Sequence, residues 1–308
     1  MPLLLISPFF LWGTAMVAMK GAIAHTTPLF VASVRLLPAG LLILIVAALW
    51  GLPQPRGWRA WGWIALFALL DGFLFQSCLA EGLARTGAGL GSVMIDSQPL
   101  AIALLSSWLF GEVIGLWGWL GLGIGVLGIS LIGLPEAWLL GWLRGPAVLP
   151  AWPGASLFSS GELWMLLAAL SMALGTVSIR FVSRHADPVV ATGWHMILGG
   201  LPLLLLSGAW ESGQVVNLTG SDWLALGYAA VLGSAIAYAI FFYIAASGNL
   251  TSFASLTFLT PVFALVFGNL LLAEVLSPIQ WSGTVLTLVS IYLINRREQI
   301  ATWWQERR

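Results

Sequence analysis

The sequence predicts an all-α integral membrane protein with about ten transmembrane helices, arranged as two inverted five-helix repeats. Three observations support this fold class. Charged residues make up only 8% of the 308 residues and hydrophobic residues 59%, whereas a soluble domain carries about 25% charged residues. The apolar residues fall into runs of about 20, the length that crosses about 30 Å of hydrocarbon. The two halves of the chain also repeat each other's pattern of residues.

Apolar windows place ten spans along the chain, and short polar turns or turns with proline and glycine separate most of them. The longest connection carries Pro146, Pro150 and Pro153, and we expect it to be an irregular linker. The polar end of the chain is expected to form a short surface helix. The predicted units are a first repeat at 1–134, the linker at 135–160, a second repeat at 161–295 and a cytoplasmic tail at 296–308. The ten spans are expected at residues 3–22, 29–50, 61–84, 91–110, 116–134, 161–182, 189–210, 223–246, 252–272 and 278–295.

The repeat is visible in the spacing of particular residues. At an offset of 160 positions, Pro28 and Arg35 of the first half match Pro188 and His195 of the second. Beyond a two-residue insertion, the offset is 162 through three consecutive spans. Because five spans is an odd number, the second half enters the membrane from the opposite side, so a pseudo-two-fold axis in the membrane plane relates the halves. The pairs at the second offset are Trp61 with Trp223, Pro99 with Pro261, Glu112 with Glu274 and Trp119 with Trp281.

The distribution of basic residues predicts that both termini are cytoplasmic. This orientation leaves only Lys20, Arg85 and Arg144 facing outward. The membrane is expected to be a plasma or inner membrane. Net charge is zero, with 12 basic and 12 acidic residues, so there is no basic field to attract nucleic acid. The basic residues placed inside are Arg56, Arg59, Arg180, Arg184, Arg296, Arg297, Arg307 and Arg308.

Charged residues within spans are the first candidates for a binding site, because each costs about 2.5–3.5 kcal/mol at the bilayer centre and usually faces a cavity or a partner. Asp71 lies in the third span, Asp96 in the fourth and Arg35 in the second. We expect these residues to contact substrate, and one acid that changed its surroundings could couple transport to protons. The alternative is that each acid pairs internally with Arg35 or His195 and only holds helices together.

Further candidates are the polar and aromatic residues that lie within spans. Packing is the alternative role for each aromatic residue. A separate prediction concerns Pro99 and Pro261, which occupy equivalent depths in the two halves. Each proline removes a helical hydrogen bond and permits a kink, so the two could act as hinges or could merely fit the curvature of the helices. The further substrate candidates are Trp12, Gln76, Gln98, His195 and Tyr238.

Other charged residues and glycines are expected to have structural roles. Lys20 and Arg180 lie near span ends, where long basic side chains reach the interface. Glu112 and Glu274 close their spans. The glycines of the fifth span include a small-xxx-small spacing that permits close helix contact. Packing within the chain is the default interpretation, and a homodimer contact is the alternative.

Three groups of motifs resemble a known family. The stretch Thr260-Pro261-Val262-Phe263-Ala264-Leu265, then Ala273-Glu274 and Gln280-Trp281-Ser282-Gly283, resembles the end of an EamA domain of the drug/metabolite transporter superfamily. Gln98-Pro99-Leu100, Gly111-Glu112 and Trp119-Leu120-Gly121 resemble the same pattern in the first half. The start of such a domain is matched by Gly13-Thr14, Lys20 and Arg35. The resemblance therefore covers nearly the whole chain as two tandem copies.

The resemblance implies a ten-helix carrier in which the first four helices of each half line a central cavity and the fifth lies at the periphery. Members export or exchange amino acids, other metabolites or drugs. The long linker, and His195 where a second arginine would stand, depart from the family pattern. They bear on substrate binding rather than on the fold.

The predicted function is a secondary transporter, an exporter or exchanger of an amino acid, an amine or an amphiphilic drug-like compound. No cofactor or metal is expected, and there is no phosphate loop for ATP. An antiporter of phosphorylated sugars or nucleotide sugars is the alternative, but such substrates demand several buried cations. An intramembrane enzyme is less favoured, because HExxH and GxSxG motifs are absent from the sequence.

Overall fold

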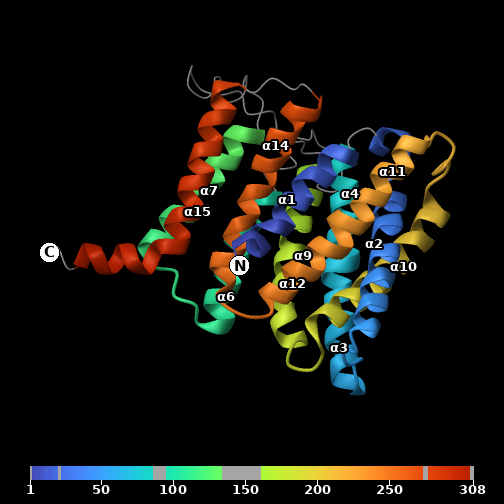
Figure 1. Cartoon of the computed structure of the whole chain (residues 1–308), viewed down its shortest axis with the longest axis horizontal. Coiled ribbons are helices and arrows are strands. Elements are labelled where there is room, and N and C mark those ends of the chain that lie inside the picture. The colour runs from blue at the N-terminus through green and yellow to red at the C-terminus, as the bar shows by residue number, and fades with distance from the viewer. Residues whose placement is uncertain (1, 20–21, 86–94, 134–160, 273–276, 306–308) are drawn as a thin grey trace.

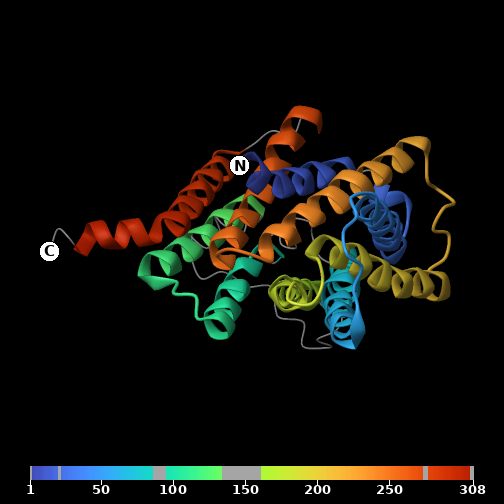
Figure 2. The ribbon, with the colours of Figure 1, turned by 60° about the horizontal axis from the view of Figure 1, so that its bottom comes forward.

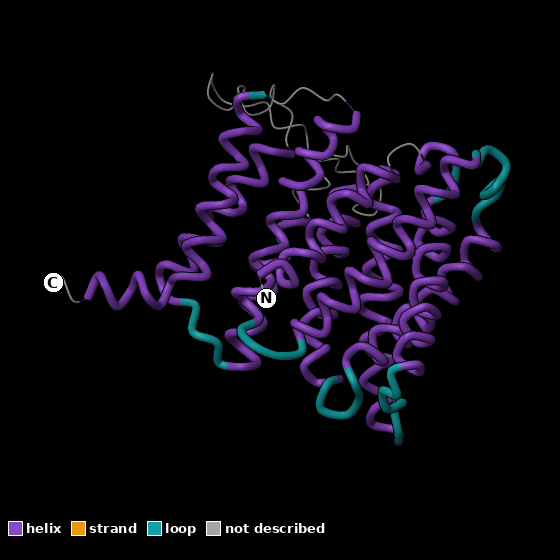
Figure 3. The backbone as a smooth tube through the Cα atoms, viewed as in Figure 1, coloured by secondary structure: helices purple, strands orange, loops and turns teal. Residues whose placement is uncertain are grey.

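The computed structural model describes residues 2–19, 22–85, 95–133, 161–272 and 277–305. Every regular element in this part of the chain is a helix (Figure 3). The predicted linker lies outside the described residues, as do Lys20 and Glu274. The fold prediction of an all-α membrane protein is therefore confirmed.

The helices follow the predicted spans in order (Figure 1). Within the described residues, seven helical segments are long and apolar enough to cross a membrane, and Leu3–Met19 and Gln98–Phe110 are shorter apolar helices. The first repeat comprises α1 (Pro2–Met19), η1 (Ala22–His25), α2 (Pro28–Leu49), α3 (Gly57–Phe67), η2 (Ala68–Phe75), α4 (Gln76–Arg85), α6 (Gln98–Phe110) and α7 (Gly115–Gly133). The second comprises α9 (Gly161–Val182), α10 (Pro188–Trp210), α11 (Gly220–Tyr228), η4 (Ala229–Ile236), α12 (Ala237–Ala245), α13 (Leu250–Ala254), η5 (Ser255–Phe258), α14 (Leu259–Leu272) and α15 (Pro278–Gln305).

Contacts between the repeats occur in reciprocal pairs. Helix α1 packs on α14, and its counterpart α9 packs on α6. Likewise α2 packs on η4 while α10 packs on η2, and α2 and α10 also pack on each other. A two-fold relation requires this reciprocity, because the rotation that exchanges the two repeats turns each contact between them into its counterpart.

The fifth helices of the two repeats form a pair of their own. Helices α7 and α15 lie side by side at one edge of the molecule in both ribbon views (Figures 1 and 2). Glycines of the fifth span lie in this contact, so they serve packing within the chain. Helix α15 continues to Gln305 and its last part extends away from the bundle (Figure 1). The short surface helix expected after residue 295 is thus the end of α15.

The third span of each repeat contains a stretch of π-helix. In the first repeat η2 separates α3 from α4, and in the second η4 separates α11 from α12. At the offset of 162, residues 68–75 correspond to 230–237, so the two π stretches occupy nearly the same place in their repeats. A π-helix is rare and is often found at functional sites. The residues in these two stretches are therefore candidates for the functional site.

Two carboxylates clamp the repeats together by accepting hydrogen bonds at helix N-termini. Glu211, at the end of α10, accepts from the backbone N–H groups of Leu29 and Phe30 at 2.9 and 3.1 Å. Glu112, after α6, accepts from the N–H groups of Leu250 and Thr251 at 2.9 and 3.1 Å. An N-terminus has unpaired N–H groups and a partial positive charge, which a carboxylate satisfies. The clamps lie at opposite ends of the bundle (Figure 1).

Arg180 of α9 takes part in the Glu112 clamp. Its guanidinium lies 3.1 Å from the Glu112 carboxylate and donates to the carbonyl of Gly248. Partial burial raises the pKa of Glu112, but hydrogen bonds from Leu250 and Thr251 and the charge of Arg180 together bring it below its usual value. The structural role expected for Glu112 thus has a specific form, a clamp between the two repeats.

Replacing Gly128 by alanine should destabilise the pairing of α7 and α15. A Cβ at Gly128 would lie 2.5 Å from Thr287 Oγ1 and 2.8 Å from the Thr287 backbone nitrogen, so the helices would have to separate. We expect a lower melting temperature in detergent for Gly128→Ala. Gly123→Ala on the same helix is the control, because a Cβ there meets nothing within 4 Å. Equal melting temperatures for the two variants would contradict this packing.

Replacing Glu112 by alanine should also lower the melting temperature, because a buried hydrogen-bond donor left unpaired costs about 1–3 kcal/mol. The lowered pKa gives this stabilisation a pH dependence: it is complete above the usual carboxyl pKa and is lost as the pH falls through the lowered value. The difference in melting temperature between wild type and Glu112→Ala should therefore shrink in acid. The exposed Glu298→Gln is the control, and a difference independent of pH would argue against the clamp.

Candidate functional site

A buried ion-pairing contact joins the two repeats at the centre of the bundle. Asp71 lies in η2 and His195 in α10, and His195 Nε2 is 3.1 Å from Asp71 Oδ2. Both side chains are at most 1% exposed. Phe67 of α3 stacks on the imidazole with ring centroids 4.1 Å apart. Of the two internal partners that the sequence left open for Asp71, the structure selects His195.

The equivalent place in the other repeat holds a contact of the same kind. Arg35 occupies the position in α2 that His195 occupies in α10, and its Nη2 lies 3.4 Å from Ser234 Oγ in η4. Ser234 follows Gly233, the counterpart of Asp71. Each second helix therefore directs a basic side chain at the π stretch of the opposite repeat. Sequence reasoning missed Ser234, although its place beside the counterpart of Asp71 was a usable signal.

A third group of side chains links these two contacts. Tyr238 of α12 lies within electrostatic range of both Asp71 and Arg35. Its hydroxyl is 3.3 Å from Gln76 Nε2 of α4, and its ring packs edge-on against Trp12 of α1 with centroids 5.1 Å apart. Six of the predicted substrate residues thus converge from six helical segments of both repeats. We define the central cluster as Trp12, Arg35, Asp71, Gln76, His195, Ser234 and Tyr238.

The central cluster contains buried polar atoms that have no hydrogen-bond partner among the described residues. These are Trp12 Nε1, Arg35 Nε and Asp71 Oδ1. A buried polar group without a hydrogen bond costs about 1–3 kcal/mol, and buried polar atoms in proteins are normally paired. Two donors and one acceptor are therefore available to a ligand that carries both kinds of group.

Asp96 and Gln98 do not join this cluster. Both are buried, at 7% and 1% exposure, but among the described residues no hydrogen bond or ion pair connects either of them to it. Within the described part of the chain, Gln98 Oε1 and Nε2 both lack hydrogen-bond partners. Pro99 follows a break in the helix at Ser97, and Pro261 follows the 3₁₀ turn η5 at the start of α14. The fourth spans are thus interrupted beside both prolines, and their action as hinges remains a prediction.

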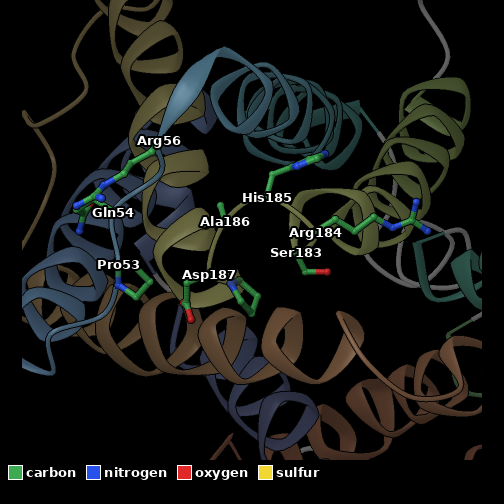
Figure 4. A pocket seen from close by; sticks show the side chains of 9 residues that line it. Pro53, Gln54, Arg56, Ser183, Arg184, His185, Ala186 and Asp187 are labelled. Carbon is green, nitrogen blue, oxygen red and sulfur yellow. The ribbon is translucent and has the colours of Figure 1, made fainter.

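A cavity of about 590 Å³ opens at one end of the bundle, away from the central cluster. It lies between the α2–α3 and α9–α10 connections and is lined by residues such as Arg56 and Arg184 (Figure 4). Two of its polar side chains are engaged: Gln54 accepts from Trp194 Nε1, and Asp187 caps α10. No member of the central cluster lines it. Among the described residues there is also no group of three metal-binding side chains, so the candidate site is the central cluster.

A bundle of apolar helices with a buried polar cluster between two inverted repeats is the architecture of a membrane transporter. Comparison with known families specifies the class: the EamA-like transporter family matches residues 1–134 and 159–296. The chain belongs to this family. It is therefore a multi-pass membrane transporter rather than an enzyme, and the resemblance noted in the sequence is confirmed.

Individual relatives and a solved structure agree with the family. The chain is 66% identical to an uncharacterized transporter of Synechocystis sp., covering 97% of this chain and 90% of that protein. It is 52% identical to a WAT1-related chloroplastic protein of Arabidopsis thaliana, covering 94% and 68%, and 30% identical to protein PecM of Dickeya dadantii, covering 94% and 92%. A crystal structure with 18% identity superposes with a TM-score of 0.77 over 94% of both chains, which supports the fold alone.

Replacing Gly175 by alanine should displace Asp71 from His195. A Cβ at Gly175 of α9 would lie 2.7 Å from Asp71 Cβ and 3.0 Å from its Oδ1. Because the chain has only three histidines, the His195 ring can be followed by ¹⁵N NMR. We expect its resonances to move in Gly175→Ala and to stay in Gly208→Ala, where a Cβ meets nothing within 4 Å. Unmoved resonances in Gly175→Ala would contradict the placement of Asp71.

Proposed function

We propose that the protein is a secondary transporter that exports or exchanges a small molecule carrying an ammonium group, such as an amino acid, an amine or an amphiphilic drug-like compound. The observation that supports this most directly is the central cluster. It offers an acid, a base and unpaired polar atoms in one buried place between the repeats. The cargo would bind there and cross as the repeats exchange conformations.

The charge of the central cluster supports this class of cargo over phosphorylated compounds. Arg35 is its permanently charged cation, and its guanidinium reaches Ser234 only at 3.4 Å. Phosphate recognition typically uses several cationic donors. Asp71 with an unpaired Oδ1 suits an ammonium group, and Arg35 with an unpaired Nε suits a carboxylate. An amino acid or a similar zwitterion presents both groups together.

The membrane and the orientation are also part of the proposal. We place the protein in a plasma or inner membrane with both termini cytoplasmic, on the distribution of its basic residues. Arg56 and Arg184 then lie on the cytoplasmic side, where the cavity between the helix connections opens. Bending beside Pro99 and Pro261 would allow the fourth helices to move during the exchange of conformations.

Ligand-induced stabilisation of the purified protein tests this function. The panel contains amino acids such as leucine, amines such as phenethylamine, nucleosides, common drugs, and sugar phosphates such as glucose 6-phosphate. A ligand that binds only the folded state stabilises it by about 2.7 kcal/mol at a hundredfold excess over its dissociation constant. We expect amino acids or amines to raise the melting temperature of the wild type, and this rise to be lost in Asp71→Asn.

The matched control is Asp96→Asn, which changes a second buried acid outside the central cluster. It should keep the ligand-induced rise in melting temperature. A rise lost in Asp96→Asn and kept in Asp71→Asn would move the site to the fourth helix. Stabilisation by sugar phosphates alone would favour the phosphate antiporter instead. Flux of the stabilising compound in proteoliposomes then separates a carrier from a binding protein.

A further inference from the structure

The hydrogen bonds of His195 define where its protons are. Its Nδ1 lies 2.6 Å from the carbonyl oxygen of Thr192, and a carbonyl can only accept a hydrogen bond. Nδ1 must therefore carry a hydrogen. In a neutral imidazole this leaves a lone pair on Nε2, the nitrogen that lies 3.1 Å from Asp71 Oδ2.

This arrangement requires one further proton in the pair. A lone pair on Nε2 and a carboxylate oxygen repel each other, so a hydrogen bond between them needs a hydrogen that belongs to one of the two. If Asp71 holds it, a neutral acid donates to a neutral imidazole. If His195 holds it, an imidazolium donates to a carboxylate. Both arrangements contain the same proton and have zero net charge, so the described geometry is that of the pair with one proton bound.

The surroundings of the pair make its net charge important. Phe67 from α3 covers His195, and Gly175 from α9 lies against Asp71. Among the residues that the structure describes, the titratable and charged groups that face the pair are Tyr238 from α12 and, beyond it, Arg35 from α2. In a site that is almost completely buried, a net charge is costly unless a counter-charge compensates it. Loss of the proton would leave a net charge of −1, which a cation could compensate.

We propose that the Asp71–His195 pair binds one exchangeable proton, and that the ammonium group of the cargo takes the place of this proton at Asp71. The proton leaves the gap between Oδ2 and Nε2 for water, and no covalent bond between heavy atoms changes. The carboxylate then accepts hydrogen bonds from the ammonium group through Oδ2 and through Oδ1, which lacks a partner in the described structure. The binding of the proton is independent of the proposed function, whereas its exchange for cargo rests on it.

Proton release from the purified protein tests the first half without any substrate. The protein in weakly buffered detergent is titrated from about pH 5 to about pH 10, a range that brackets the ordinary histidine titration, and the protons released per chain are counted. We expect the wild type to release one proton more than Asp71→Asn. The exposed Glu298→Gln should match the wild type. Equal release by wild type and a folded Asp71→Asn would overturn the proposal.

A second variant keeps the test decisive if Asp71→Asn does not fold. His195→Gln retains the acid but removes the imidazole, so the pH at which the proton leaves should move. An infrared band of a protonated carboxyl, or the ¹⁵N signal of an imidazolium, reports which partner holds the proton. An unmoved midpoint in His195→Gln would overturn the sharing of the proton between the two residues.

The exchange is tested by adding leucine and phenethylamine to the proton-loaded protein. Each compound that stabilises the wild type should release one proton per bound molecule. The control Glu298→Gln should release the same number as the wild type. Binding without proton release would overturn the exchange while leaving the proposed function intact. If neither compound binds, both the exchange and the proposed cargo class are contradicted. The titration still decides whether the pair binds a proton.

Discussion

The cost of burying charge between the repeats is the constraint on which the rest of this structure depends. An ionisable residue at the centre of a bilayer costs about 2.5–3.5 kcal/mol on insertion scales, and lipid supplies no hydrogen-bonding partner. Asp71 can be buried because His195, from the other repeat, contacts its carboxylate. Arg35 is placed by the same geometry opposite Ser234. Equivalent positions of the two second helices thus both carry a basic side chain, and the second helices and π stretches must stay close for both contacts to exist.

The inverted repeat allowed more of this arrangement to be predicted than single residues could. The order of the helices followed from apolar runs, and the equivalence of Arg35 and His195 followed from the offset of 160 positions. Six of the eight predicted substrate residues meet in the central cluster. The exceptions, Asp96 and Gln98, were chosen because they are polar and lie within a span. That criterion identifies burial, which the structure confirms, but it does not show which neighbour a helix face contacts.

Other features could not be predicted because they depend on partners distant in sequence. The partner of Arg180 was not predicted, since nothing near it in sequence shows that Glu112 lies within 3.1 Å. The clamp of Glu211 on α2 joins residues more than 180 positions apart. The π stretches have no composition of their own, because a short widening of the helix leaves the apolar pattern of a span almost unchanged. These features are therefore determined by tertiary contacts rather than by the local sequence pattern.

The two carboxylate clamps have a consequence for the membrane as an electrical barrier. Glu211 and Glu112 are both engaged in the same conformation, one at each end of the bundle. Each uses a different acid and a different helix N-terminus, so one can dissociate while the other stays closed. A transporter that releases its clamps one at a time never opens a continuous water path. The ion gradients across the membrane would then survive every transport cycle.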